Sequence, residues 1–152
     1  MIRRSPQWLV TPAPAVRYEA TLQLKSAALA IHQANQEKLA QEVTRFMAEN
    51  PAGEAQLFKQ LSDNLAPIFE RAHINLDPYV PKNTQQFGKY LAISIENGEH
   101  PLCVQLFAFG PNQKTLIHSH PWECASIVLR GHVIEKTYET AGLAPMVQPA
   151  VS

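Results

Sequence analysis

The sequence predicts an α+β fold, with helices in the first half of the chain and strands in the second. Apolar residues recur at helical spacing as far as residue 72. After residue 86 the apolar residues fall in short runs, several of them β-branched, that are separated by turn-forming residues. Helices followed by strands are typical of an α+β layout. We expect the chemistry to lie in the β part, which contains the most informative histidines.

The helical half contains two clear periodic segments. Residues 19–49 form the first, and Asn50-Pro51 should end it because a residue before proline avoids the helical region. The second starts near Glu54. Pro67 either ends that helix or opens a short further one. The apolar residues that define these segments are Leu24, Ala28, Ile31, Leu39, Val43, Phe46, Leu57, Phe58, Leu61, Leu65, Ile68, Phe69 and Ala72.

The sequence of the second half of the chain predicts five strands connected by turns. Asn97-Gly98, Gly110-Pro111-Asn112 and Gly131-His132 are the turn signals. The expected strands are Tyr90–Ile95, Leu102–Phe109, Thr115–His120, Ala125–Arg130 and Val133–Glu139.

The domain organisation follows from these patterns. Residues 1–18 contain three arginines, three prolines and no acid, and we expect a flexible tail there. Residues 19–86 form a helical segment, and residues 87–152 form the β part.

Composition excludes several classes of protein. Of 152 residues, 13 are basic and 13 acidic, with no basic run, so nucleic acid is not an expected partner. No apolar stretch is long enough to span a membrane. Cys103 and Cys124 are too few for the disulfide framework of a small secreted protein, so we expect reduced thiols and a cytoplasmic location.

Residues 117–131, IHSHPWECASIVLRG, contain the candidate site. His118 and His120 lie two apart, and on a strand both imidazoles would point to the same face, as a metal requires. Cys124, four residues after His120, would share that face, whereas Glu123 would point away. A β-bulge could reverse this assignment and make Glu123 a metal ligand.

The segment from Gly110 to Gly131 resembles the first conserved motif of the cupin superfamily, in which a glycine, a His-x-His pair, a glutamate and a second glycine recur. Cys124 stands in place of the glutamate. A cysteine at this position resembles the pattern of the thiol dioxygenases, and of the cysteine dioxygenase family in particular. This resemblance implies a cupin-type antiparallel β-barrel. It also implies a mononuclear Fe(II) site that oxidises a small thiol to its sulfinate with O2.

The resemblance implies a role for each site residue. His118 and His120 would bind Fe(II), and Cys124 would shape the pocket beside the metal. The family's substrate-binding Tyr-x-Arg segment corresponds to Phe87-Gly88-Lys89, so Lys89 would bind the substrate's carboxylate as a point charge.

The third histidine of such a site is not identified in this chain. His132 should lie at the far end of the barrel, because a strand would carry the chain about 20 Å away from Cys124. We expect His100 to be solvated, and His32 and His73 to be surface or hydrogen-bonded side chains of the helical half. The β part is about half as long as a cupin barrel. The sequence therefore suggests an incomplete barrel and a fragment of a longer protein.

Three functions stay open at this point. The first is thiol dioxygenation, and the second is another metal-dependent cupin activity that uses Glu123. The third is a non-catalytic cupin-like protein. The sequence does not indicate an oligomeric state.

Overall fold

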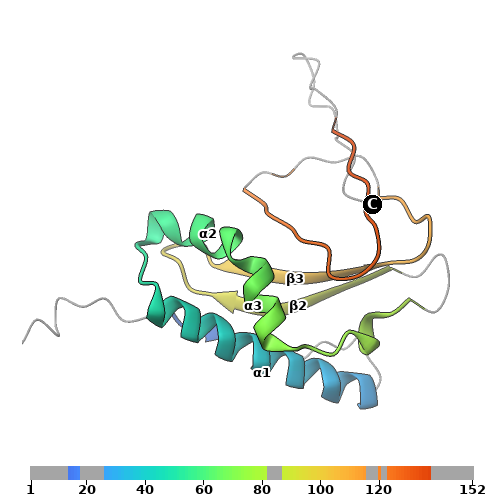
Figure 1. Ribbon diagram of the computed structural model, residues 1–152, viewed down its shortest axis with the longest axis horizontal. Coiled ribbons are helices and arrows are strands. Elements are labelled where there is room, and N and C mark those ends of the chain that lie inside the picture. Colours follow the sequence, from blue (N-terminus) through green and yellow to red (C-terminus); the bar gives the residue numbers. More distant parts are fainter. Residues whose placement is uncertain (1–13, 18–25, 82–86, 116–119, 121–122, 138–152) are drawn as a thin grey trace, which may run out of the picture. The chain divides into compact units, whose positions relative to one another are not determined.

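The computed structural model describes residues 14–17, 26–81, 87–115, 120 and 123–137 (Figure 1). These residues form three helices, a short 3-10 helix and three strands. The elements are β1 (Val16–Arg17), α1 (Ser26–Glu49), α2 (Glu54–Asp63), α3 (Leu65–Ala72), the 3-10 helix η2 (Asp77–Tyr79), β2 (Phe87–Ile95) and β3 (Leu102–Phe109).

The three strands form one antiparallel sheet in the order β1-β2-β3. β1 pairs with the end of β2, with Val16 opposite Ile95 and Arg17 opposite Ser94. The mixed helix-and-sheet class agrees with the predicted α+β fold, but a complete cupin barrel is not present in the described residues.

The chain divides into two compact units. The first unit comprises residues 1–75 and 91–104, and the second comprises residues 76–90 and 105–152. Strands β2 and β3 each contribute residues to both units.

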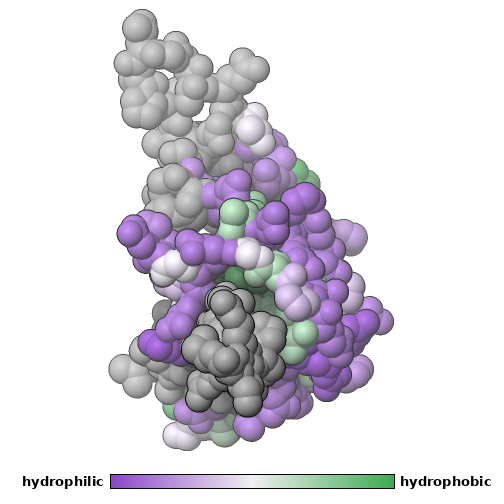
Figure 2. All heavy atoms as spheres, turned by 90° about the vertical axis from the view of Figure 1, so that its left-hand side faces the viewer, coloured by the Kyte–Doolittle hydropathy of each residue, from purple (hydrophilic) through white to green (hydrophobic). Residues whose placement is uncertain are grey.

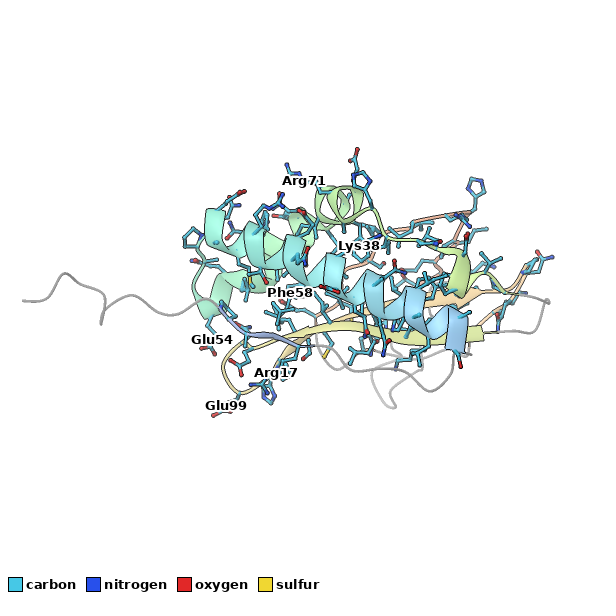
Figure 3. The ribbon with its side chains drawn as sticks, turned by 90° about the horizontal axis from the view of Figure 1, so that it is seen from below. Arg17, Lys38, Glu54, Phe58, Arg71 and Glu99 are labelled. Atoms are coloured by element: carbon cyan, nitrogen blue, oxygen red, sulfur yellow. The ribbon has the colours of Figure 1, made fainter. Side chains whose placement is uncertain are left out.

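The first unit contains most of the buried apolar side chains. Helix α1 packs against α3 and contacts β1, and α3 also contacts α2 (Figures 1 and 3). Burial of apolar surface is the main force that holds such an assembly together. The buried apolar residues are Leu39, Val43, Phe46, Met47, Leu57, Leu61, Ile68, Phe69, Ala72, Ala92, Ile93 and Ile95.

The helix ends have local causes that were largely visible in the sequence. The backbone N–H and side-chain Nδ2 of Asn50 both donate to the carbonyl of Phe46, at 2.9 and 3.0 Å, and Pro51 then follows. This confirms the predicted end of α1. Pro67 lies in the first turn of α3, where its missing N–H has no intrahelical partner to lose. Of the two predicted alternatives, the one in which Pro67 opens a short further helix is therefore confirmed.

The segment expected to be a flexible tail is ordered at its end. Val16 and Arg17 form β1 because β2 offers a strand edge, and the Glu96 backbone N–H donates to the Ala15 carbonyl at 2.9 Å. An ion pair of 2.8 Å joins Arg17 to Glu96. Residues 1–13 lie outside the described part of the chain.

The predicted strands Tyr90–Ile95 and Leu102–Phe109 are confirmed as β2 and β3. The predicted strands Ala125–Arg130 and Val133–Glu139 are wrong wherever they are described, because residues 123–137 contain neither helix nor strand. A β-branched sequence favours a strand only when a neighbouring strand supplies hydrogen bonds and side-chain contacts. The predicted strand Thr115–His120 lies mostly outside the described residues.

Candidate functional site

The proposed metal-binding segment is only partly described. His118 lies outside the described residues. His120 is exposed and is not in a strand, and Glu123 and Cys124 are exposed in a stretch without regular structure. Strand alternation therefore does not decide which of Glu123 and Cys124 shares a face with His120.

No group of three or more histidine, cysteine, aspartate or glutamate side chains able to hold a metal ion occurs among the described residues. These residues thus do not by themselves supply the donor set that a mononuclear Fe(II) site needs. His132, the one histidine that follows His120 in the printed sequence, is exposed beside Gly131. Gly131 adopts a φ of 86°, which is consistent with the predicted turn.

The two cysteines differ in their surroundings. Cys103 is exposed on β3. Partial desolvation raises the pKa of the Cys124 thiol above its usual value. This desolvation favours the neutral thiol form of Cys124 over the thiolate.

Lys89, the candidate carboxylate-binding residue, lies exposed on β2 in the second unit. Its Nζ is 5.9 Å from the centroid of the Phe107 ring, within the range of a cation–π contact. The Phe107 and Phe109 rings stack with centroids 6.4 Å apart and planes 16° from parallel. An ammonium beside one aromatic ring can still pair with an anion from solvent, since Lys89 itself is exposed.

Of the other histidines, the exposed ones behave as the sequence suggested. His100 and His73 are exposed, and His73 ends α3 in a left-handed conformation with φ of 50°. Lys38 Nζ, on the α1 face shown in Figure 3, donates to the His73 carbonyl at 3.4 Å. His32 is fully buried and hydrogen-bonds to the backbone of Leu91, but its Nε2 atom is buried without a hydrogen bond in the described part of the chain, so the expected satisfied side chain is found only in part.

A buried polar cluster on α1 is a feature that the sequence did not predict. We define it as His32, Asn35 and Gln36, each of which is almost completely inaccessible to solvent. Gln36 Nε2 donates to the Leu91 carbonyl at 3.0 Å. Asn35 Nδ2 donates to the Asn75 carbonyl at 2.7 Å, and the Asn75 N–H donates back to Asn35 Oδ1 at 2.8 Å. Burial lowers the pKa of the His32 imidazole.

The spacing of this cluster was the signal that could have revealed it. Positions 32, 35 and 36 lie on the helix face that also contains Leu39 and Val43, so polar residues interrupt an otherwise apolar stripe. The cluster joins α1 to β2 and to the chain after α3.

Figure 2 shows the surface at the end of the first unit that contains the C-terminus of α1, the start of α2 and the β2–β3 turn. The described surface there is mostly hydrophilic, with some apolar atoms near the centre of the view. No helix in the described residues is long and apolar enough to cross a membrane.

Comparison of the chain with protein families, with curated proteins and with solved structures found no match.

Proposed function

We propose that this chain belongs to an Fe(II)-dependent protein that oxidises a small thiol, such as cysteine, to its sulfinate with O2. The observation that carries the proposal is the spacing of His118, His120, Cys124 and Gly131 in one stretch of sequence. Two imidazoles two residues apart suit Fe(II), and a site with neutral ligands attracts an anionic thiolate. Because both cysteines can be reduced thiols, we also propose a cytoplasmic location.

Two features of the described residues are compatible with this proposal. Strands β2 and β3 occupy the positions at which a cupin-type sheet would begin. Lys89 projects from β2 with its ammonium beside Phe107, where it would bind the carboxylate of a thiol substrate. The complete ligand set requires groups beyond the described residues.

Metal analysis tests the proposal directly. The purified chain, loaded anaerobically with Fe(II), should retain iron, and His118→Ala and His120→Ala should each lose most of it. His132→Ala is the matched control and should retain iron, because this histidine is not a proposed ligand. Equal iron retention by all four proteins would exclude a site at His118 and His120.

Oxygen uptake tests the reaction itself. The iron-loaded protein should consume O2 when cysteine or 3-mercaptopropionate is added, and Lys89→Met should raise KM for either carboxylated thiol more than it lowers kcat. The absence of thiol-dependent uptake by a protein that does bind iron would contradict thiol dioxygenation while leaving the metal site intact.

A second candidate is a metal-dependent cupin activity in which Glu123 is a ligand. It is favoured by one observation: Glu123 and Cys124 both lie outside a strand, so alternation does not turn Glu123 away from His120. Glu123→Gln would then empty the site and Cys124→Ala would not. The opposite result, with iron retained in Glu123→Gln, would exclude this candidate.

A further inference from the structure

The turn between β2 and β3 contains Asn97-Gly98, the sole place in the sequence where glycine follows asparagine. The turn is tight, because the His100 backbone N–H donates to the Asn97 carbonyl at 3.3 Å. Gly98 is exposed to solvent. A bond between its backbone nitrogen and the Asn97 side-chain carbonyl carbon would close a small, unstrained ring, and glycine has no side chain that could hinder this approach.

The two groups that would react are available in the described part of the chain. Among those residues the Asn97 side chain makes no hydrogen bond, and the Gly98 N–H makes none either. Water reaches the turn, since Gly98 and Glu99 are both exposed.

Other asparagines of the chain lack this combination. Asn112 also lies in a turn, but the Gln113 N–H that follows it donates to the Gly110 carbonyl at 3.1 Å and lies beside the Gln113 side chain. Asn50 precedes Pro51, which has no N–H. Asn112 therefore serves as an internal control for Asn97.

The fold requires glycine at position 98. Its φ of 61° is one that other residues rarely adopt. In addition, the Glu54 carboxylate, from the first turn of α2, fills the space that a Cβ at position 98 would occupy. Figure 3 shows Glu54 at the same end of the first unit as Arg17 and Glu99. The reactive Asn97-Gly98 pair is therefore part of the contact between α2 and the β2–β3 turn.

We propose that Asn97 is a site of spontaneous covalent modification, at which asparagine converts to aspartate and isoaspartate, and that this conversion loosens the contact between α2 and the β2–β3 turn. The Gly98 nitrogen loses its proton and bonds to the Asn97 side-chain carbonyl carbon. The side-chain amide takes up a proton and leaves as ammonia.

Water then opens the resulting cyclic imide. Its hydroxyl adds to one of the two carbonyl carbons, and its hydrogen returns to the Gly98 nitrogen as the carbon–nitrogen bond breaks. Opening at the side-chain carbonyl gives aspartate, and opening at the main-chain carbonyl gives isoaspartate. The net change consumes water and releases ammonia, and it needs no oxidant or reductant.

Both products disturb the turn. Isoaspartate inserts a methylene into the main chain of the turn that joins β2 to β3, and it converts the carbonyl that accepts the His100 hydrogen bond into a free carboxylate. Either product adds a negative charge between Glu96 and Glu99 in sequence, and near the Glu54 carboxylate that contacts Gly98. Like charges at such short range repel one another. This inference does not depend on the proposed metal site or on thiol oxidation.

The first test measures conversion at each asparagine. The full-length chain is incubated at neutral and mildly alkaline pH, and its peptides are analysed by mass spectrometry, with an isoaspartyl methyltransferase to detect isoaspartate. A sample that was not incubated corrects for conversion during digestion. Asn97 should convert severalfold faster than Asn112, and faster still as the pH rises, because the attacking nitrogen must lose its proton.

The second test measures the structural consequence by thermal unfolding. The wild-type chain, incubated until Asn97 has converted, should unfold at a lower temperature than the fresh chain. Asn97→Ser, incubated in parallel, should keep its own unfolding temperature. Asn97→Asp should unfold at a lower temperature than Asn97→Ser, and the difference should shrink at high salt because salt screens the repulsion.

Three outcomes would overturn the proposal. Conversion at Asn97 that is no faster than at Asn112 would exclude Asn97 as the preferred site. An unchanged unfolding temperature after conversion would exclude the loosening of the turn. An equal fall in the incubated Asn97→Ser chain would assign the loss of stability to another group.

Discussion

His32 is a residue whose burial makes stability depend on pH. Its folded-state pKa is lowered from the ordinary value of 6.5, and burial is the largest cause. The unfolded chain therefore binds the proton more readily than the folded chain. The free energy of unfolding therefore has its full value, as far as His32 is concerned, above pH 6.5. It should fall as the pH decreases from 6.5 toward the lowered folded-state pKa of His32.

Urea unfolding at a series of pH values between neutral and mildly acidic measures this dependence. His32→Gln should flatten the curve below pH 6.5, because glutamine has no proton to gain. His100→Gln is the matched control, since His100 is exposed, and it should keep the wild-type pH dependence. A His32→Gln chain that loses stability with acid as steeply as the wild type would contradict the assignment.

Asn35 is a second residue with a measurable structural contribution. Its side chain makes two hydrogen bonds to the backbone of Asn75, so Asn35→Ala leaves a carbonyl and an N–H partly unsatisfied. We expect a loss of about 1–3 kcal/mol in the free energy of unfolding. Gln33→Ala, on the exposed side of the same helix, should change it by less than about 0.5 kcal/mol in a urea titration.

At the scale of elements, the helices depend on a shared apolar core. Ile68 of α3 is buried where α3 meets α1, and Ile68→Ala should cost about 2–5 kcal/mol of unfolding free energy. Ile134→Ala is the matched control, because Ile134 is 68% exposed, and the change should be below about 0.5 kcal/mol. Equal losses in the two variants, measured by thermal or urea unfolding, would contradict this placement of the core.

The helices and the first hairpin could be predicted because their signals are local. At Asn50-Pro51, α1 ends through a hydrogen bond from Asn50 to Phe46, which lies one helical turn earlier. Asn97-Gly98 connects the adjacent strands β2 and β3. Gly98 adopts a φ of 61°, a conformation that glycine allows at little cost. Such features depend on neighbours in sequence, which are visible in the chain itself.

The later strands could not be predicted because a strand depends on distant partners. Ile127, Val128 and Ile134 have strand-forming side chains, yet residues 123–137 form no ladder in the described chain. β1 was missed for the converse reason: two residues are too few to show a strand pattern in the sequence, and the edge of β2 orders them. The same difficulty affects the candidate site, because the facing of His120, Glu123 and Cys124 was argued from strand alternation, and these three residues lie outside a strand where the structure describes them.

At the scale of the whole molecule, the two units should differ in local stability. The first contains most of the buried apolar side chains, whereas the second has Tyr79, Tyr90 and Leu106 as its buried apolar residues among those described. Amide hydrogen exchange of the dilute chain should therefore be slow in α1 and fast in residues 125–137. Comparable protection of these two segments in the dilute chain would contradict the placement of residues 125–137 outside the sheet.

The small strand β1 has a practical consequence for producing this protein. Residues 14–17 cover the end of β2 through the Val16–Ile95 pairing and the Ala15–Glu96 hydrogen bond. A recombinant version that starts at or before residue 14 retains β1 and its pairing with β2. A version that starts after residue 17 lacks β1, so the edge of β2 beside the buried side chain of Ile95 is exposed to solvent. The second version should be the one that precipitates on concentration, so the cloning boundary belongs upstream of Pro14.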